Sequence, residues 1–563
     1  MTATPSTTIA SSLRDEWLAL ACAGLFGVVY WTFWVDPAIL DPTNVDWLLD
    51  NTDRGVNYLG WALFRDTPWA WPLGLNPRYG LELSSSIVYS DSIPLLALPF
   101  KALGGVLPRP FQYLGLWTLV CAVLQGVFGY LLARRLGAGT EAALVASAFC
   151  VAAPVLVARS SHLALTAHWT LLAAFYLYFG RATRLLPWIV LLAVVAAIHP
   201  YLFIMVLAVF CADLLKRHRL EVTGIPRLLG NGIVAVAISA AIMWSIGMFV
   251  GASPEADGFG YFKHDLLGLV DAGRFSRLFV DIPNGAGAYE GYGFLGTGII
   301  LLALATLPAM GQLKRISVSE IWPLALVVIV MFVFSLSNAI DIAGTTVLTL
   351  PLPDALARLA GILRSSGRFV WPAVYLATIF VVLAMTWRYR RYGTAIAAAC
   401  LALQVFDMAP GIAATRERAT MIAAAPQPIS PLWAELAQHY QRVRAIPVQH
   451  PGLSWHYASR VAARYGMATD SVYLARVPPL AEAQQRAEEA LSTGAFDPGA
   501  VYILDDAART AAAAQARPGD LMTVIDGRHI FAREGCVSLP DLCEGSPVLT
   551  LDNMGGATAP HRL

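Results

Sequence analysis

The sequence predicts an all-α polytopic membrane protein with about eleven spans, in which residues 412–563 form a C-terminal extracytoplasmic α/β domain. Of the 563 residues, 57% are hydrophobic and only 14% are charged, and the mean hydropathy is +0.58. A water-soluble fold of this length could not bury so much apolar surface, so the lipid bilayer must act as its solvent. The balanced charge, a net +1, argues against a nucleic-acid partner.

Eleven apolar segments approach the roughly 20 residues that a membrane-spanning helix needs. They are 17–35, 113–133, 141–158, 163–180, 185–198, 201–215, 226–250, 292–310, 321–337, 369–387 and 393–411. Segment 93–108 is also apolar. Its Pro94, Pro99 and Lys101 favour a helix that lies in the membrane interface without crossing.

The basic residues predict the orientation of the spans. The clusters fall in alternate loops, on the same side as the N-terminus: Arg134-Arg135, Arg181 with Arg184, Lys216-Arg217-Arg219, Lys314-Arg315 and Arg388-Arg390-Arg391. That side is expected to be cytoplasmic. The first loop, 36–112, and the tail then face outward, and the Ala- and Arg-rich composition suits a bacterial inner membrane with a periplasmic C-terminal domain.

The tail differs in composition from residues 1–411. Short β-like runs near 501–506 and 521–533 are joined by Asp-Gly and Pro-Gly turns, and Ala-rich helical stretches lie between them, which predicts a small α/β domain. It carries no phosphate-binding or nucleophile-elbow motif. Cys536 and Cys543 are expected to pair if the tail faces an oxidising compartment.

The first outer loop holds the candidate catalytic carboxylates. Asp53, Asn57 and Trp61 repeat at helical spacing and should share one face. Arg65 follows one turn later and could hold a phosphate. Asp91 lies at or near the start of the interfacial helix. The simpler interpretations are a solvated loop acid for Asp53 and a helix cap for Asp91. The competing acids in this loop, Asp46 foremost, are Asp36, Asp41, Asp46, Asp50 and Asp66.

Cationic and imidazole side chains are also expected near the outer surface. Arg364 and Arg368 precede the span at 369, on the side that the positive-inside rule disfavours, and Arg159 is placed in the same way. His162, His168 and His199 lie at outer span ends. They could bind phosphate, sugar or, with a carboxylate, a metal. Charged helix ends and packing histidines are the structural alternatives. Loop 253–291 could form a lid over the site.

These features resemble the GT-C glycosyltransferases, most clearly the protein mannosyltransferase and aminoarabinose transferase group, over the first 215 residues or so. The matching residues are Asp53 with Tyr58, then Ser92-Ile93-Pro94-Leu95, Leu131-Leu132-Ala133-Arg134-Arg135-Leu136-Gly137 and Arg159-Ser160-Ser161-His162. Arg54 follows Asp53 where the family commonly has an acid, and Asp91-Ser92-Ile93-Pro94 replaces a His-Pro-Pro pattern. These departures leave open a requirement for Mg²⁺ or Mn²⁺ and the type of acceptor.

The resemblance implies inverting transfer of a monosaccharide from a polyprenyl-phosphate donor to a glycan, lipid or protein acceptor of the cell envelope. Asp53 would be the general base, and Asp91 would position the acceptor or a metal. Arg65, Arg364 and Arg368 would hold the phosphate. A transporter or flippase of a lipid-linked glycan, a non-catalytic envelope assembly protein and a membrane hydrolase are the alternatives. Transporters place charged groups at mid-membrane, whereas here polarity gathers at the outer surface.

Overall fold

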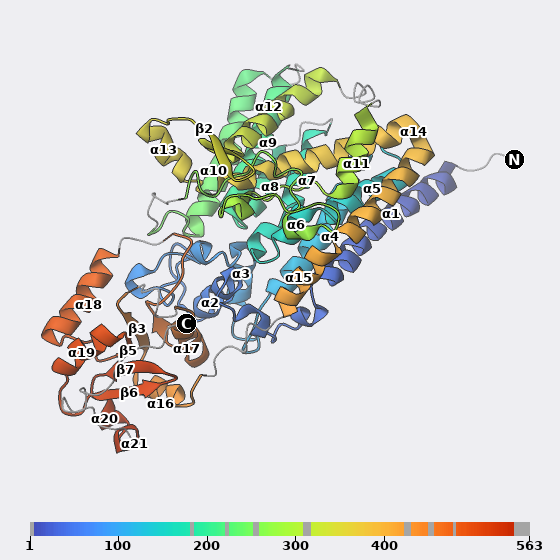
Figure 1. Ribbon diagram of the computed structural model, residues 1–563. Coiled ribbons are helices and arrows are strands. Elements are labelled where there is room, and N and C mark those ends of the chain that lie inside the picture. Colours follow the sequence, from blue (N-terminus) through green and yellow to red (C-terminus); the bar gives the residue numbers. More distant parts are fainter. Residues whose placement is uncertain are drawn as a thin grey trace.

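The computed structural model describes residues 5–180, 185–219, 224–251, 258–307, 317–420, 429–448, 455–476 and 480–544. Figure 1 shows a body of long helices with a smaller body of helices and strands at one end. The expected basic residues Arg181, Arg184, Lys314 and Arg315 lie outside the described residues, as does the start of the expected lid, 253–257.

Within the described part of the chain, six helical segments are long and apolar enough to cross a membrane. They fall in α1 (Pro5–Trp34), α4 (Leu114–Arg135), α5 (Thr140–Val151) with α6 (Pro154–Ala158), α10 (Ile225–Ser245), α12 (Val318–Ser335) and α14 (Trp371–Asp407). The helical membrane architecture is therefore confirmed in outline.

The count of eleven spans stays a prediction. Within the described residues, three of the expected spans contain only shorter apolar helices, which are Leu163–Tyr178 with α7 (Trp169–Tyr178) as its second part, α8 (Leu185–Ala196) and α11 (Thr297–Thr306). Helices of about 10 to 16 residues rise about 15–24 Å, less than the roughly 30 Å of a bilayer core. A further expected span forms α9 (Pro200–Arg219), which is 20 residues long and ends in four basic residues.

The predicted division between 387 and 393 is confirmed by a break inside α14. Arg390 has φ 50° and ψ −127°, which no helix contains. A Cβ on Gly393 would lie 2.3 Å from the backbone oxygen of Met385, whereas eight residues of continuous helix would separate them by about 12 Å. The chain therefore folds back on itself here, and α15 (Ala409–Thr420) follows the second arm.

The first outer loop folds into short helices around one longer helix. They are η1 (Pro37–Leu40), η2 (Asp46–Leu48), α2 (Asp53–Arg65), η3 (Leu81–Leu83), η4 (Ile87–Ser90) and α3 (Pro94–Ala102). The nine residues of α3 are too few to cross a bilayer. The helix predicted from the spacing of Asp53, Asn57 and Trp61 is confirmed as α2, and nearly all of this helix is buried.

The later loops carry the remaining elements of the helical body. They are η5 (Leu163–Thr166), η6 (Gly273–Phe275), η7 (Ala288–Gly291), the hairpin β1 (Ala339–Ile342) and β2 (Thr345–Thr349), α13 (Asp354–Gly361) and η9 (Ser366–Val370).

The C-terminal body is an α/β domain, as predicted. Its five-stranded sheet has the order β4 (Ala468–Thr469), β3 (Arg442–Ile446), β5 (Ala500–Leu504), β7 (Arg528–Ala532), β6 (Leu521–Ile525). Strand β3 pairs parallel with β4 and β5, and β7 pairs antiparallel with β5 and β6. The helices are α16 (Leu432–His439), α17 (Trp455–Tyr465), α18 (Ala481–Thr493), α19 (Asp506–Ala514), α20 (Gly535–Ser538) and α21 (Asp541–Glu544).

Two local predictions for this domain are confirmed. Asp526 and Gly527 form the turn between β6 and β7, with φ values of 52° and 73°, the conformation that tight hairpin turns require. Cys536 and Cys543 form a disulfide.

Backbone hydrogen bonds fasten the C-terminal domain to the first outer loop. The Gly80 N–H donates to Thr469 O at 2.8 Å, and the Thr469 N–H donates to Arg78 O at 3.0 Å. Arg444 of β3 forms an ion pair with Glu82 at 2.8 Å. The domain therefore sits at the end of the helical body that carries the loop.

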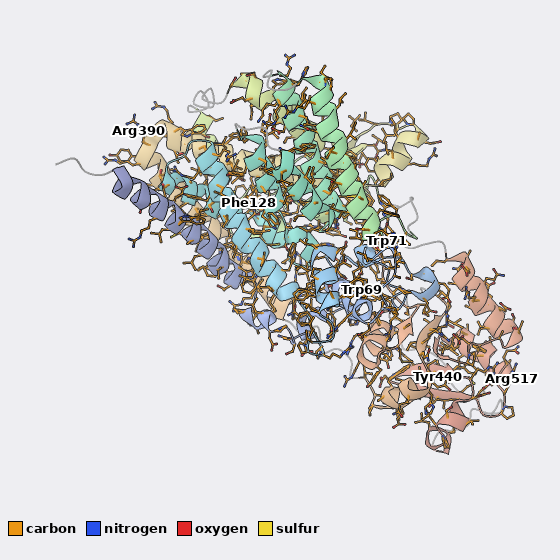
Figure 2. All side chains as sticks on the ribbon, turned by 180° about the vertical axis from the view of Figure 1, so that it is seen from behind. Trp69, Trp71, Phe128, Arg390, Tyr440 and Arg517 are labelled. Carbon is orange, nitrogen blue, oxygen red and sulfur yellow. A yellow bond between two sulfur atoms is a disulfide. The ribbon has the colours of Figure 1, made fainter. Side chains whose placement is uncertain are left out.

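The opposite end carries the basic clusters that the structure describes. Arg134 forms an ion pair with Glu16 of α1 at 3.3 Å, and one cavity is lined by the 138–142 turn together with Arg390 and Arg391. Figure 2 shows Arg390 at the end of the helical body away from Tyr440 and Arg517 of the C-terminal domain. These basic residues thus lie at the same end as the start of α1, as the sequence predicts.

Candidate functional site

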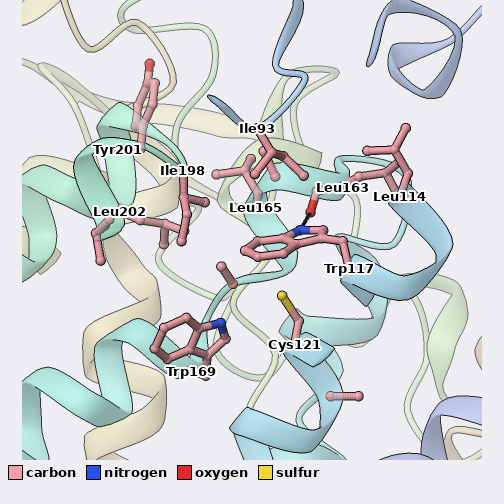
Figure 3. Close-up of a cluster of buried hydrophobic side chains, with 14 of the residues drawn as sticks. Ile93, Leu114, Trp117, Cys121, Leu163, Leu165, Trp169, Ile198, Tyr201 and Leu202 are labelled. Carbon is pink, nitrogen blue, oxygen red and sulfur yellow. Dashed lines mark hydrogen bonds between the residues drawn. The ribbon is translucent and has the colours of Figure 1, made fainter. Parts of the chain in front are cut away.

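A cluster of buried hydrophobic side chains holds the loops that carry the polar candidates. Figure 3 shows Ile93 and Leu163 near Trp117 of α4, whose indole N–H donates to Leu163 O at 2.8 Å, and Ile198 and Tyr201 farther from the indole in the same cluster. These residues are immediate or near neighbours in sequence of Asp91, His162 and His199. Close packing leaves such loops little freedom, so three segments distant in sequence present their polar side chains to one place.

Two cavities meet at this place. The first, which we call the ionic cavity, has a volume of about 490 Å³, and its polar lining includes Asp53, Asn57, Asp91, His162, His199, Glu290, Arg364 and Arg368. The second, which we call the adjoining cavity, has a volume of about 760 Å³ and is lined by Trp34, Ile39, Trp47 and Phe275, among others. Asp53, His162 and Tyr289 line both cavities.

Glu290 is the electrostatic centre of the ionic cavity. Its carboxylate accepts hydrogen bonds from Arg368 at 2.8 and 3.1 Å and from Arg159 at 2.9 Å. Burial acts most strongly on the Glu290 pKa and raises it, but the two guanidinium groups outweigh burial and hold that pKa well below its usual range. Glu290 is therefore ionised, and the two arginines are neutralised only in part.

His162 lies between Asp53 and Glu290. Its Nδ1 is 3.2 Å from Asp53 Oδ2 and its Nε2 is 3.7 Å from Glu290 Oε1. Burial lowers the His162 pKa, assisted by Arg368 and Arg159 and opposed by the two carboxylates. The imidazole is therefore neutral at neutral pH.

Asp53 is the open carboxylate of this group. Its side chain is 39% exposed, and it is the first residue of α2. The N-terminus of a helix carries partial positive charge, which stabilises an adjacent carboxylate. Asp53 can therefore reach a ligand in either cavity.

Asp91 and His199 form the second acid–imidazole pair. The backbone N–H of Tyr201 donates to His199 Nδ1 at 3.2 Å, which places the imidazole proton on Nε2, 3.7 Å from Asp91 Oδ1. Burial raises the Asp91 pKa to about 7, with Arg368 acting in the opposite direction. The alternative interpretation of Asp91 as the cap of the next helix is wrong, because Ile93 occupies the N-cap of α3 and Asp91 is the C-cap of η4 with φ 51°.

Arg364 supplies a cation that the cavity does not neutralise. Within the described residues its guanidinium forms no hydrogen bond or ion pair, and it lies 5.9 Å from the ring of Phe262. Arg476 of the C-terminal domain donates to the carbonyl oxygen of Ile362, which precedes Arg364 by two residues. Arg476 and Tyr473 line the same cavity. The Ala475 N–H donates to Tyr89 O at 2.8 Å, which fixes segment 471–476 as one wall of the ionic cavity.

Three sequence-predicted residues line neither of the two cavities. Trp61 donates to Phe111 O at 2.9 Å and is fully buried. Arg65 donates to the carbonyls of Gly104, Leu107 and Pro108, each at 2.7 Å. His168 Nδ1 is 2.8 Å from Tyr375 Oη inside the bundle. Trp61 and Arg65 follow Asp53 by 8 and 12 residues, so α2 carries them about 12–18 Å from it.

Asn57 lines the ionic cavity, but its amide donates to Ser90 O at 3.0 Å and so joins α2 to η4. Four of the five competing acids of the loop have local partners. Asp36 and Asp41 accept hydrogen bonds within turns. Asp50 forms an ion pair with Arg54, and Asp66 forms one with Arg109 at 2.6 Å. Asp46 lines a different cavity.

Glu290 and the wall from the C-terminal domain were not predicted from the sequence. The available signal was a single acid within the Gly- and Tyr-rich run 285–293, and the outward placement of Arg159, which is its partner. The described part of the expected lid is packed closely, since a Cβ on Gly291 would lie 2.5 Å from Lys263 O. In the described ranges, no three His, Cys, Asp or Glu side chains are placed to hold a metal ion.

Together, the fold and the site define a helical membrane-type protein with an ionic site where the bundle, the first outer loop and a C-terminal α/β domain meet. The chain belongs to the family DUF6311, a domain of unknown function, which residues 24–409 match. Residues 432–533 match the DUF6311 C-terminal domain. No curated protein matches the chain.

Proposed function

We propose that this protein is a membrane glycosyltransferase of the GT-C type, which transfers a monosaccharide from a polyprenyl-phosphate donor to an acceptor of the cell envelope with inversion. The observation that supports the proposal most directly is the position of Asp53. It is an accessible carboxylate that lines both cavities, so a donor in one and an acceptor in the other would meet beside it.

In the proposed reaction, the acceptor hydroxyl attacks the anomeric carbon while Asp53 takes its proton. The bond between that carbon and the phosphate oxygen breaks, and polyprenyl phosphate leaves with the bonding electrons. Arg364 and Arg476 line the ionic cavity and would stabilise the phosphate charge as it develops. Arg368 would act indirectly, because its guanidinium is bonded to Glu290.

We further propose the bacterial inner membrane as the location, with eleven spans and the basic end in the cytoplasm. The basic residues Arg134 and Arg390 lie at the end of the body remote from the C-terminal domain, as the positive-inside rule would require. The Cys536–Cys543 disulfide suits a periplasmic domain.

Donor affinity should fall as the pH rises above about 7, because the Asp91 pKa is raised to about 7, first by burial. Below that pH the neutral carboxyl can donate to a phosphate oxygen, and above it the carboxylate repels the phosphate. If only the protonated form binds, the donor Kd rises by up to about tenfold per pH unit.

The same pH dependence is the basis for a control variant. The neighbouring His199 and His162 have lowered pKa values and so stay neutral in this range. Asp91→Asn should therefore bind the donor with a Kd that is flat between pH 6 and 8.5. A wild-type Kd that does not change with pH would contradict this role for Asp91.

The function is tested by transfer of radiolabelled sugar from a panel of synthetic polyprenyl-phosphate donors to envelope extract, catalysed by the purified protein with and without Mg²⁺ or Mn²⁺. Donor-dependent labelling of the extract would support a transferase. Absence of transfer from every donor, with movement of a fluorescent lipid-linked glycan across proteoliposomes that contain the protein, would favour the flippase alternative.

A further inference from the structure

A third cavity lies on the other side of α2, between the first outer loop and α17 of the C-terminal domain. It has a volume of about 460 Å³ and is walled by apolar side chains that include Leu59, Trp61 and Phe111. Figure 1 shows α17 beside α2, at the junction of the two bodies. Its charged lining consists of four arginines and two aspartates, Arg65, Arg109, Arg460, Arg464, Asp46 and Asp66.

Arg460 is the unusual member of this lining. It is only 9% exposed, its Nε has no hydrogen-bond partner, and within the described residues its guanidinium forms no hydrogen bond or ion pair. Burial of a guanidinium without a counter-charge is costly. Arginines buried in this way normally bind a carboxylate or a phosphate in bidentate fashion.

The neighbouring charges do not supply the missing partner. Asp66 is engaged by Arg109 through two hydrogen bonds of 2.6 and 2.8 Å. Asp46 lies near enough to influence Arg460 electrostatically but forms no ion pair with it. The Arg65 guanidinium adds positive charge, and its Nε also lacks a partner. The cavity therefore keeps a net positive charge around a buried donor group.

We propose that this third cavity is a binding site for a phosphoryl group, with Arg460 as its principal ligand and Arg464 and Arg109 at its rim. Phosphate fits the planar guanidinium fork, and the aromatic walls would accommodate the glycerol or sugar attached to it. Phe111 lies three residues before α4 begins, so the phosphoryl group could belong to a lipid headgroup or to a soluble phosphorylated glycan. The site does not depend on the proposed transferase activity.

The test compares thermal unfolding of the full chain in a phosphate-free detergent with added inorganic phosphate or glycerol 3-phosphate, and with phosphatidylglycerol against phosphatidylcholine in nanodiscs. Chloride at equal ionic strength is the control for screening. We expect a saturable rise of several degrees in Tm for the wild type. A rise with the soluble anions identifies free phosphate as the source, and a rise with phosphatidylglycerol alone identifies the lipid headgroup.

Three variants make the test specific. Arg460→Gln should abolish the rise and, without phosphate, should unfold at the wild-type temperature or above, because it removes an unpaired buried charge. Arg517→Gln removes an exposed charge that does not line the cavity, at the end of the C-terminal domain away from the helical body (Figure 2), and should keep the full rise. Arg364→Gln removes a cation from the ionic cavity and should keep the part of the rise that Arg460→Gln abolishes, so it separates phosphate in the third cavity from phosphate in the ionic cavity.

Three results would overturn the proposal. The first is a lower Tm of Arg460→Gln without phosphate, and the second is a phosphate-induced rise in Tm that persists in Arg460→Gln. The third is a wild-type Tm that changes neither with the soluble anions nor with phosphatidylglycerol. The first would show that Arg460 is a structural residue. The second would place the anion elsewhere.

Discussion

Asp53→Asn is expected to lower the rate of sugar transfer by about 10³-fold, within the 10²–10⁴-fold range that general acid–base groups contribute. The amide has the size of the carboxylate but cannot take the proton of the acceptor hydroxyl. Asp53 is not a member of the buried ion pairs that Glu290 forms with Arg159 and Arg368. Its side chain is 39% exposed. The variant should therefore fold, and its donor Kd should change little.

The measurement is single-turnover transfer of labelled sugar, with donor Kd determined separately. The matched control is Asp41→Asn, which makes the same chemical change in the same loop at an exposed turn, where Asp41 bonds to Thr43. That variant should retain wild-type transfer. If Asp53→Asn transfers sugar at the wild-type rate, Asp53 is not the base, and Asp91 becomes the carboxylate to test next.

Local sequence patterns were sufficient for much of the fold. The Asp526-Gly527 turn between two alternating runs predicts the β6–β7 hairpin, because few other residues adopt positive φ at both positions. The basic break between two apolar runs predicts the reversal at Arg390. Hydropathy alone could not set helix length. Segment 185–198 is apolar throughout, yet α8 ends at Ala196, just before the turn that carries His199.

The site was harder to predict, because its geometry depends on contacts between distant segments. Helical spacing correctly placed Asp53, Asn57 and Trp61 on one helix. It could not show that the helix rises away from the cavity, so that Trp61 reaches Phe111 instead. Glu290 contacts Arg159 across 131 residues of sequence, and no periodicity links two such positions. The outward placement of the arginines predicted the region of the site. Their partner, Glu290, could be identified only from the three-dimensional structure.

Glu290→Gln is expected to destabilise the protein by about 3–5 kcal/mol, the usual cost of removing one partner from a buried ion pair. Glu290 is 4% exposed, and Arg159 and Arg368 are 3% and 8% exposed. The glutamine keeps the shape of the side chain but leaves two guanidinium groups buried together without a counter-charge. Reversible denaturant or thermal unfolding in detergent measures the loss. The control is Glu320→Gln, an exposed position in α12, where a change within about 0.5 kcal/mol is expected.

The contribution of ionised Glu290 to the free energy of unfolding should also depend on pH. The pKa of Glu290 in the folded protein lies below its ordinary value of 4.5, so its stabilisation is complete above that value and is lost as the pH falls below it. Wild-type stability should therefore decline more steeply in acid than that of Glu290→Gln.

The double variant Arg159→Gln/Glu290→Gln separates the charge effect from simple loss of packing. Removing Arg159 from the Glu290→Gln protein leaves one buried guanidinium where there were two, so the second substitution should recover part of the stability lost in the first. In the wild-type background, Arg159→Gln should destabilise, because Glu290 then loses the 2.9 Å contact. Opposite signs in the two backgrounds are the mark of direct coupling. Simple additivity would mean that Glu290 supports the site through packing alone, and the electrostatic account of the ionic cavity would then be wrong.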